Sequence, residues 1–388
     1  MPENKEDVVE MKKESKEPPI LTEELFRRQA LKAVEKPTEP VTLTYGTYRM
    51  SKHSELELIQ DKEYEGYYRV QAKILLDQIE HRPPFDRIPS KQLDAEKIDF
   101  SEIQVKTEGL RLPYLPVKFT PELIKLEIGQ RRLPPSDFDY AVKGEKLDRP
   151  TNVFNPDDRY IYRDTSFPWC TVGRVDTPLG YCAGVTIGHR LLLTCNHVIQ
   201  WNSDGTCGYV RFRPGYYNGN APFGEAWATM VHSWIKVIGG DGLTDRETAF
   251  DYVVCALDTR MGDIVGYPGY RRYDDDWNGG SYWQHMGHPN DLSGGERPAF
   301  QGRCVISSKS EESAVGRIGY VLGHFNDVVG GHSGGPAWGW WGSEHWPRVV
   351  GVQSAEAVTP SNNTSGDNEF GGGPALSDLI TWARSEYP

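Results

Sequence analysis

Short apolar runs separated by turn residues fill the chain from about residue 170 onward. The runs at 181–188, 191–195 and 252–257 are rich in Val, Leu, Ile and Tyr, and glycines lie within and between such runs. Runs of this length with glycine-rich boundaries are typical of β-strands. Others lie at 172–175, 209–212, 227–231, 282–287, 302–306, 336–338 and 348–352. Strands at this density predict an all-β fold, either a sandwich or a barrel.

The end of the chain has a different period. Leu376, Leu379, Ile380 and Ala383 repeat at i, i+3, i+4 and i+7. This spacing places the four side chains on one face of a helix. We therefore expect a short amphipathic helix at the C-terminus, with one buried face.

The region before residue 153 has another composition. It contains no Trp or Cys and only five of the 40 glycines. Residues 1–40 mix acidic and basic side chains with few apolar ones, which predicts a charged segment that is disordered or transiently helical. Residues 41–152 form a mixed extension with a strand-like run at 41–45, helical spacing at 68–79 and proline-punctuated stretches. We expect 41–152 to wrap another surface or to act as a linker, and 153–388 to form the main domain.

Charge and hydropathy exclude several classes of partner. The net charge is −12 without a basic block, so a nucleic-acid partner is not expected. No run of 18 apolar residues occurs, which argues against a membrane-spanning helix. The first residues lack the apolar core of a secretory signal, and six cysteines in 388 residues are no disulfide scaffold. We therefore expect a cytoplasmic location, while the oligomeric state stays open.

Three short motifs carry candidate chemistry. His197 follows the apolar run at 191–195, Asp251 precedes the run at 252–257, and Ser333 lies within a glycine-rich loop at 330–335. Singly, each has an ordinary structural explanation, as a surface histidine, a turn carboxylate or a turn serine. Together they supply a hydroxyl, a base to accept its proton and a carboxylate to hold the base, the parts needed for acyl transfer.

The order His, Asp, Ser and the flanking residues resemble the chymotrypsin-fold serine proteases. Intervals of 54 residues to Asp251, 82 more to Ser333 and 21 more to Ser354 fit that family. The segment 153–159, Val-Phe-Asn-Pro-Asp-Asp-Arg, is similar to the mature N-terminus in its glutamyl-endopeptidase-like branch. The resemblance implies two six-stranded antiparallel β-barrels, at about 168–262 and 280–372, with the C-terminal helix beneath the second. A single β-sandwich with the three residues apart is the alternative.

The resemblance also implies a mechanism. His197 would activate Ser333 for attack on a peptide carbonyl, Asp251 would orient His197, and Ser354 would support Asp251. The backbone N–H groups of Gly331 and Ser333 would form the oxyanion hole, and residues 354–356 would pair with an extended protein or peptide substrate. No metal and no organic cofactor is implied. The alternative is a catalytically silent, protease-like module that binds protein partners.

Two features depart from that branch. Many family members pair a cysteine at the position of Cys182 with the residue after the base, which is Val198 here, so that disulfide is not expected. The position of the branch's pocket histidine is Gln353, and the residue five before the nucleophile is Val328. Two carboxylates, Asp327 and Glu356, lie at candidate pocket positions and would attract Lys or Arg at P1. Basic and Glu P1 residues both stay open.

Residues 1–152 also allow two interpretations. In the resembling branch the mature chain begins at the valine that corresponds to Val153, and its α-amine lies near the pocket. That amine does not exist in the uncut chain. Residues 1–152 would therefore be a pro-segment removed near Asn152, or a permanent arm on an enzyme that needs no processing.

Overall fold

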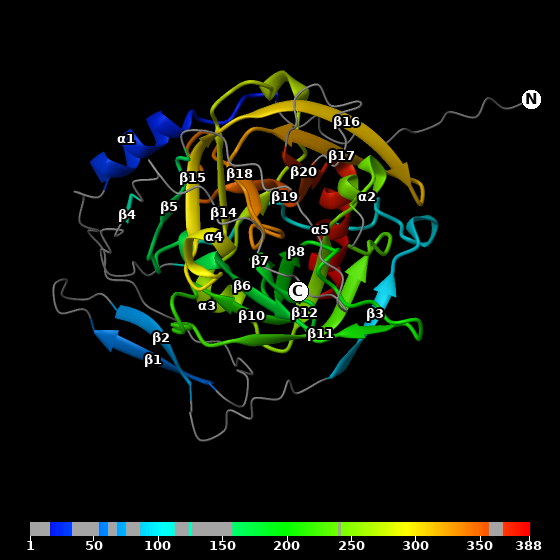
Figure 1. Cartoon of the computed structure of the whole chain (residues 1–388), viewed down its shortest axis with the longest axis horizontal. Helices are drawn as coiled ribbons and strands as arrows, with labels where there is room; N and C mark the ends of the chain where they lie inside the picture. The colour runs from blue at the N-terminus through cyan, green and yellow to red at the C-terminus, as the bar shows by residue number, and fades with distance from the viewer. Residues whose placement is uncertain are drawn as a thin grey trace, which may run out of the picture.

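The computed structural model describes residues 16–32, 54–60, 68–74, 86–112, 124–125, 157–239, 242–356 and 368–388. Strands are the main regular secondary structure, and Figure 1 shows most of them as a lower group in green and an upper group in yellow and orange. The all-β prediction is confirmed. Among the described segments, no helix is both long enough and apolar enough to cross a membrane.

The lower group is a closed barrel of six antiparallel strands. Its order is β10-β6-β7-β8-β12-β11, and pairing of β10 with β11 closes the ring. Both faces of its strands carry aliphatic side chains, such as Val185 and Val254 on one face and Val175 and Leu192 on the other, each fully buried. The strands are β6 (Val172–Thr177), β7 (Gly180–Gly188), β8 (Leu191–Thr194), β10 (Arg211–Pro214), β11 (Ala226–Ser233) and β12 (Val253–Leu257).

The upper group is a second sheet that contains the seven strands β14 to β20. The pairing path is β16-β17-β20-β19-β18-β14-β15, and only Val305 separates β15 from β16. The two ends of the path are therefore halves of one chain segment, which turns the sheet back on itself. The single-sandwich alternative is wrong. The strands are β14 (Trp283–Gly287), β15 (Ala299–Cys304), β16 (Ile306–Ala314), β17 (Arg317–His324), β18 (Pro336–Gly339), β19 (Arg348–Glu356) and β20 (Asn368–Gly372).

The predicted C-terminal helix is α5 (Pro374–Glu386), shown in red in Figure 1. The four residues of its apolar face are all buried. Arg384, on the same helix, is also buried, and its guanidinium donates to the backbone oxygens of Ile187 (2.6 Å) and Pro268 (3.0 Å). The helix contacts β12 of the first barrel as well as β17 and β20 of the second. It therefore lies against both barrels, not beneath the second alone.

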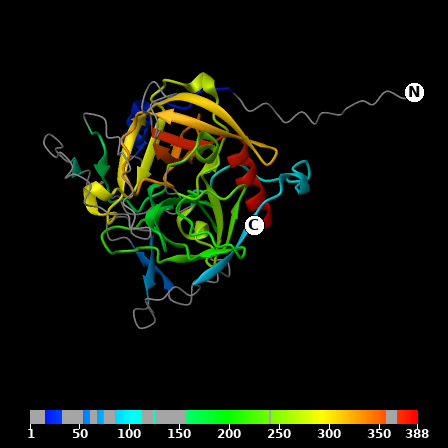
Figure 2. The same ribbon diagram turned by 45° about the vertical axis from the view of Figure 1, so that its right-hand side comes forward.

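Part of the N-terminal region packs on this core. Strand β3 (Arg87–Gln92) pairs in parallel with β11, and Figure 2 shows this cyan segment along the outside of the barrel. Strand β9 (Thr206–Gly208) pairs with β3 in turn. Further along, Arg384 Nη1 donates to the carbonyls of Lys106 (2.8 Å) and Glu108 (2.9 Å). The segment 86–112 is thus joined to the first barrel and to α5.

One expectation for the N-terminal region is wrong, the helix at 68–79. Within the charged segment expected to be disordered or transiently helical, α1 (Thr22–Lys32) is helical, and the backbone N–H of Ile20 donates to the carbonyl of Trp340 at 2.7 Å. A few apolar residues among the charges, including the buried Leu25, suffice to dock this stretch. The expected helix at 68–79 begins as the strand β2 (Tyr68–Ile74), which pairs with β1 (Ser54–Gln60). Residues spaced by four satisfy a period of two as well. The strand-like run at 41–45 lies outside the described residues.

Buried histidines predict loss of stability in mild acid. Burial lowers the pKa of His232 and of His285 to about 4 and that of His288 to about 3. The ordinary value of 6.5 applies to the unfolded chain, so below pH 6.5 the unfolded state takes up protons first. Stability present above pH 6.5 is then lost as the pH falls toward these lowered values.

We expect the free energy of unfolding to fall by about 1.4 kcal/mol per pH unit for each such histidine between pH 6.5 and 4.5. Guanidinium titrations at four pH values from 7.5 to 4.5 measure the slope. In His232→Gln the decrease of the free energy of unfolding per pH unit should be smaller by the contribution of one histidine. A stability that does not change over this range contradicts the prediction.

Candidate active site

The loop after β8 fixes the position of His197. Asn196 holds this loop with its side chain, whose Oδ1 accepts from Trp201 Nε1 and from the backbone N–H of Val237, both at 3.0 Å. Its Nδ2 donates to the carbonyl of Ile235 at 2.8 Å. These bonds fix the loop, so His197, which is 6% exposed, has a defined position after β8.

Asp251 lies between α2 (Asp245–Ala249) and β12, and it is fully buried. Its Oδ1 accepts from the backbone N–H groups of Asn196 (2.9 Å) and His197 (2.8 Å). Its Oδ2 lies 2.6 Å from His197 Nδ1 and accepts from Ser354 Oγ, also at 2.6 Å. The structure thus brings His197, Asp251 and Ser354 into one hydrogen-bonded group.

This environment fixes the charge of the carboxyl group. Burial opposes ionisation, but the neighbouring His197 and hydrogen bonds from His197 and Ser354 outweigh it and lower the pKa of Asp251. An ionised carboxylate only accepts hydrogen bonds, so His197 Nδ1 must carry the proton. The other ring nitrogen, Nε2, is then available as a base.

The loop that carries Ser333 needs glycine at two positions. Gly331 and Gly334 have φ values of +99° and +81°, a region that other residues rarely adopt. A Cβ on Gly331 would lie 2.0 Å from the carbonyl oxygen of His288, and one on Gly334 would lie 2.1 Å from that of Ala183. The backbone N–H of Ala183 also donates to the Ser333 carbonyl at 2.8 Å. Both barrels therefore shape this loop.

Gly334→Ala is expected to destabilise the fold and to move Ser333. The positive φ alone costs about 1–3 kcal/mol, and the new methyl group would overlap the carbonyl of Ala183. Urea unfolding measures the loss. Gly342→Ala is a matched control, because Gly342 has φ +50° and no atom within 4 Å of its Cβ position. Equal losses in the two variants would show that the close packing of the loop has no effect.

Two backbone N–H groups of the loop stand out. The N–H groups of His332, Gly334 and Gly335 donate to the carbonyls of Val329, Gln353 and His332 at 2.8–3.0 Å. Those of Gly331 and Ser333 donate to no group within the described part of the chain. These are the two N–H groups named for the oxyanion hole. They are free to receive an acceptor from outside the chain.

The hydroxyl of Ser333 makes no hydrogen bond to the described residues, although Ser333 is partly exposed. The nitrogen expected to act as the base, His197 Nε2, has another neighbour, which the sequence did not indicate: Cys195 Sγ lies 3.9 Å from it. Burial holds the pKa of this thiol well above its usual range, so it stays neutral. Its position two residues before His197 is the only sequence signal for it.

The candidate pocket residues are mostly engaged inside the protein. The Asp327 carboxylate, 2% exposed as a residue, accepts from Gln301 Nε2 and from the backbone N–H of Asp158, both at 3.1 Å. Gln353 Oε1 accepts from His324 Nε2 at 3.1 Å, and Val328 is 3% exposed. These contacts weaken the argument from Asp327 for a basic P1 residue, which stays a prediction. The side chain of Glu356 lies outside the described part of the structure.

All six cysteines are buried and free, so the disulfide absent from the sequence pattern is absent from the structure too. They act as small apolar residues in the two barrels. Among the described residues, no group of three or more His, Cys, Asp or Glu side chains is arranged to hold a metal ion.

Sequence comparison finds relatives among bacterial proteases, although no protein-family model matches the chain. Glutamyl endopeptidase of Bacillus licheniformis is 26% identical over 204 residues, which are 52% of this chain and 57% of that protein. A Bacillus subtilis protein named extracellular metalloprotease is 27% identical over 131 residues, or 32% of this chain and 40% of its own length. The chain thus spans about half the length of the curated relatives it matches.

Solved structures with a similar fold are also proteases by name. A Glu endopeptidase in complex with MPD is 18% identical, has a TM-score of 0.48 and covers 60% of this chain and 99% of its own. Protease Anisep from Arthrobacter nicotinovorans is 16% identical, has a TM-score of 0.39 and covers 56% of this chain and 97% of its own. The resemblance expected from the sequence is thus found again: over 204 residues the chain is similar to a glutamyl endopeptidase.

Proposed function

We propose that the protein is a serine endopeptidase that hydrolyses peptide bonds through an acyl-enzyme. The observation that carries the proposal is the buried Asp251–His197 pair, which leaves Nε2 of the ring as the free base. His197 Nε2 takes the proton of Ser333 as its Oγ attacks the substrate carbonyl. The same proton then passes to the leaving amine, and a water molecule releases the acyl group by the reverse sequence.

The N–H groups of Gly331 and Ser333 would stabilise the negative oxygen of the tetrahedral intermediate. Their freedom from internal partners within the described chain supports this role. Each such donor contributes about 3 kcal/mol to transition-state stabilisation in comparable sites. Ser354 would act indirectly, by holding the Asp251 carboxylate at 2.6 Å.

The substrates would be extended proteins or peptides, paired with residues 354–356 as an added strand. The name glutamyl endopeptidase indicates a Glu residue at P1. The Asp327 and Glu356 carboxylates would instead favour Lys or Arg there. A peptide library with all P1 residues decides between them. If Asp327 contacts P1, Asp327→Ala should lose any Lys or Arg preference that the unmodified chain has.

Rapid mixing with an activated ester tests the covalent step. An acyl-enzyme predicts a burst of released alcohol equal to the concentration of active sites, followed by slower turnover. The alternative, a protease-like module that binds partners, predicts neither burst nor cleavage. The unbonded Ser333 hydroxyl is the observation that keeps this alternative in view, although catalytic hydrogen bonds are often long before substrate binds.

A further inference from the structure

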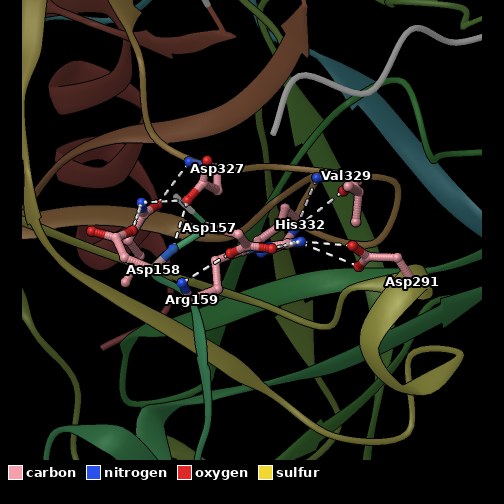
Figure 3. Close-up of polar contacts among 8 residues, drawn as sticks. Asp157, Asp158, Arg159, Asp291, Asp327, Val329 and His332 are labelled. Carbon is pink, nitrogen blue, oxygen red and sulfur yellow. Dashed lines mark hydrogen bonds and ion pairs between the residues drawn. The ribbon is translucent and has the colours of Figure 1, made fainter. Parts of the chain in front are cut away.

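A buried ion pair lies next to the nucleophile loop. Arg159 immediately precedes β5 (Tyr160–Ile161) and is 1% exposed. Its guanidinium contacts both carboxylate oxygens of Asp157 (3.0 and 2.7 Å) and both of Asp291 (3.2 and 2.6 Å). Figure 3 shows Arg159 between these two carboxylates. Planar, two-pronged pairing of this kind defines a geometry as well as a charge.

Asp291 belongs to the short helix α4 (Asn290–Ser293), whose start holds the nucleophile loop. The backbone N–H of Asn290 donates to the carbonyl of Gly330 at 2.9 Å, and that of His288 donates to the carbonyl of Gly331 at 3.0 Å. Arg159 therefore anchors the segment 288–291, which binds two consecutive carbonyls of this loop.

Holding the Gly330 carbonyl has a direct geometric consequence. In a trans peptide the carbonyl of one residue and the N–H of the next point in opposite directions. With the Gly330 carbonyl turned to α4, the N–H of Gly331 points away from α4 and is left without a partner within the described chain. A rotation of this peptide would remove one of the two oxyanion donors. The anchoring of α4 thus bears on the orientation that catalysis needs.

The charge of Arg159 also acts on the residue between the two donors. Burial is the main cause that keeps the pKa of His332 well below its usual range, and the positive charge of Arg159 is the second. The Nδ1 atom of a neutral His332 accepts from the backbone N–H of Val329 at 3.1 Å. The backbone N–H of His332 donates to the Val329 carbonyl at 3.0 Å. These bonds close the turn that leads into Ser333.

We propose that Arg159, through Asp291, is a positioning residue that holds the oxyanion loop in its working form in the uncut chain. The inference rests on the proposed function. The guanidinium supplies a cation beside the loop without a new α-amine at Val153. It therefore favours the interpretation of residues 1–152 as a permanent arm over that of a pro-segment.

The test uses the full-length chain, verified as uncut by intact mass. Asp291→Asn removes one of the two carboxylate charges that Arg159 contacts, and Arg159→Lys keeps its own charge but loses the two-pronged contacts. Asp378→Asn is the matched control, since Asp378 is 14% exposed, pairs with Arg272 and Arg317, and lies away from the loop. Measured are the rate of labelling by a fluorophosphonate and kcat and KM on the best library peptide, well below the melting temperature.

We expect Asp291→Asn to lower the labelling rate and kcat about 10²-fold with little change in KM, as for the loss of an oxyanion donor. Arg159→Lys should fall between this variant and the unmodified protein, while Asp378→Asn should keep kcat within a few-fold. Equal kcat in Asp291→Asn and Asp378→Asn would overturn the positioning role. If Asp291→Asn does not fold, an unchanged kcat in Arg159→Lys overturns it instead.

Cleavage dependence separates this inference from the proposed function. An uncut chain that labels rapidly supports the inference. An uncut chain that is inert and labels only after cleavage near Val153 overturns it and leaves the endopeptidase standing. A chain that labels in neither form contradicts the endopeptidase itself.

Discussion

Ser333→Ala is expected to lower kcat for peptide hydrolysis about 10⁶-fold, the effect of losing the nucleophile of such a triad. The loss is chemical, because alanine fits the position and the loop geometry depends on the flanking glycines. Steady-state kinetics on the best library peptide measure it. Residual turnover comes only from the oxyanion donors and from binding.

The control for Ser333→Ala is its melting temperature, which should match that of the unmodified chain. KM, or the affinity for an uncleaved peptide, should change little. A variant with more than a hundredth of the original kcat would show that another group is the nucleophile. The nearest candidate is the Cys195 thiol beside His197, so Cys195→Ala should be measured in parallel.

Asp251→Asn is expected to lower kcat about 10⁴-fold. The Asp251 carboxylate accepts four hydrogen bonds, two from backbone N–H groups, one from Ser354 and one from His197 Nδ1. An amide has one oxygen, so its NH₂ group must face a donor. The ring then favours the tautomer with the proton on Nε2, which cannot act as a base.

The pH dependence of kcat is the check on that explanation. The remaining activity of Asp251→Asn should rise with pH over a wider range than in the unmodified chain, as hydroxide replaces the base. Ser354→Ala removes only one of the four bonds and should cost far less. A loss in Asp251→Asn no larger than in Ser354→Ala would contradict the assigned role of the carboxylate.

The candidate site was largely predictable from the sequence, because its parts lie in short motifs. Glycines around Ser333 and apolar strands before His197 and after Asp251 are local signals. Each is then positioned by barrel closure. The ion pair of Arg159 with Asp291 was not predictable, since 132 residues separate the partners and the motif at 153–159 gives no sign of which carboxylate Arg159 meets. Only the fold brings them together.

The fold shows where such signals fail. The hairpin β16–β17 was largely missed, because Ser and Glu fill the segment 307–313 and its side chains are partly or fully exposed. Strand β3 was missed too, since it is short and its partner β11 lies about 140 residues later. At 16–27 the many charged residues gave no apolar pattern, although a few apolar side chains of this segment dock on the second barrel. Long-range contacts decide the last two, and backbone pairing without an apolar pattern decides the first.

Labelling with a fluorophosphonate, followed by peptide mapping by mass spectrometry, tests the central claim most directly. The reagent phosphonylates a serine only where a base and an oxyanion hole activate it. The account predicts one adduct per chain, on Ser333, and none in Ser333→Ala or after heat unfolding. A folded chain that gains no adduct, or gains it on another residue, would contradict the assignment of Ser333 as the nucleophile of a serine endopeptidase.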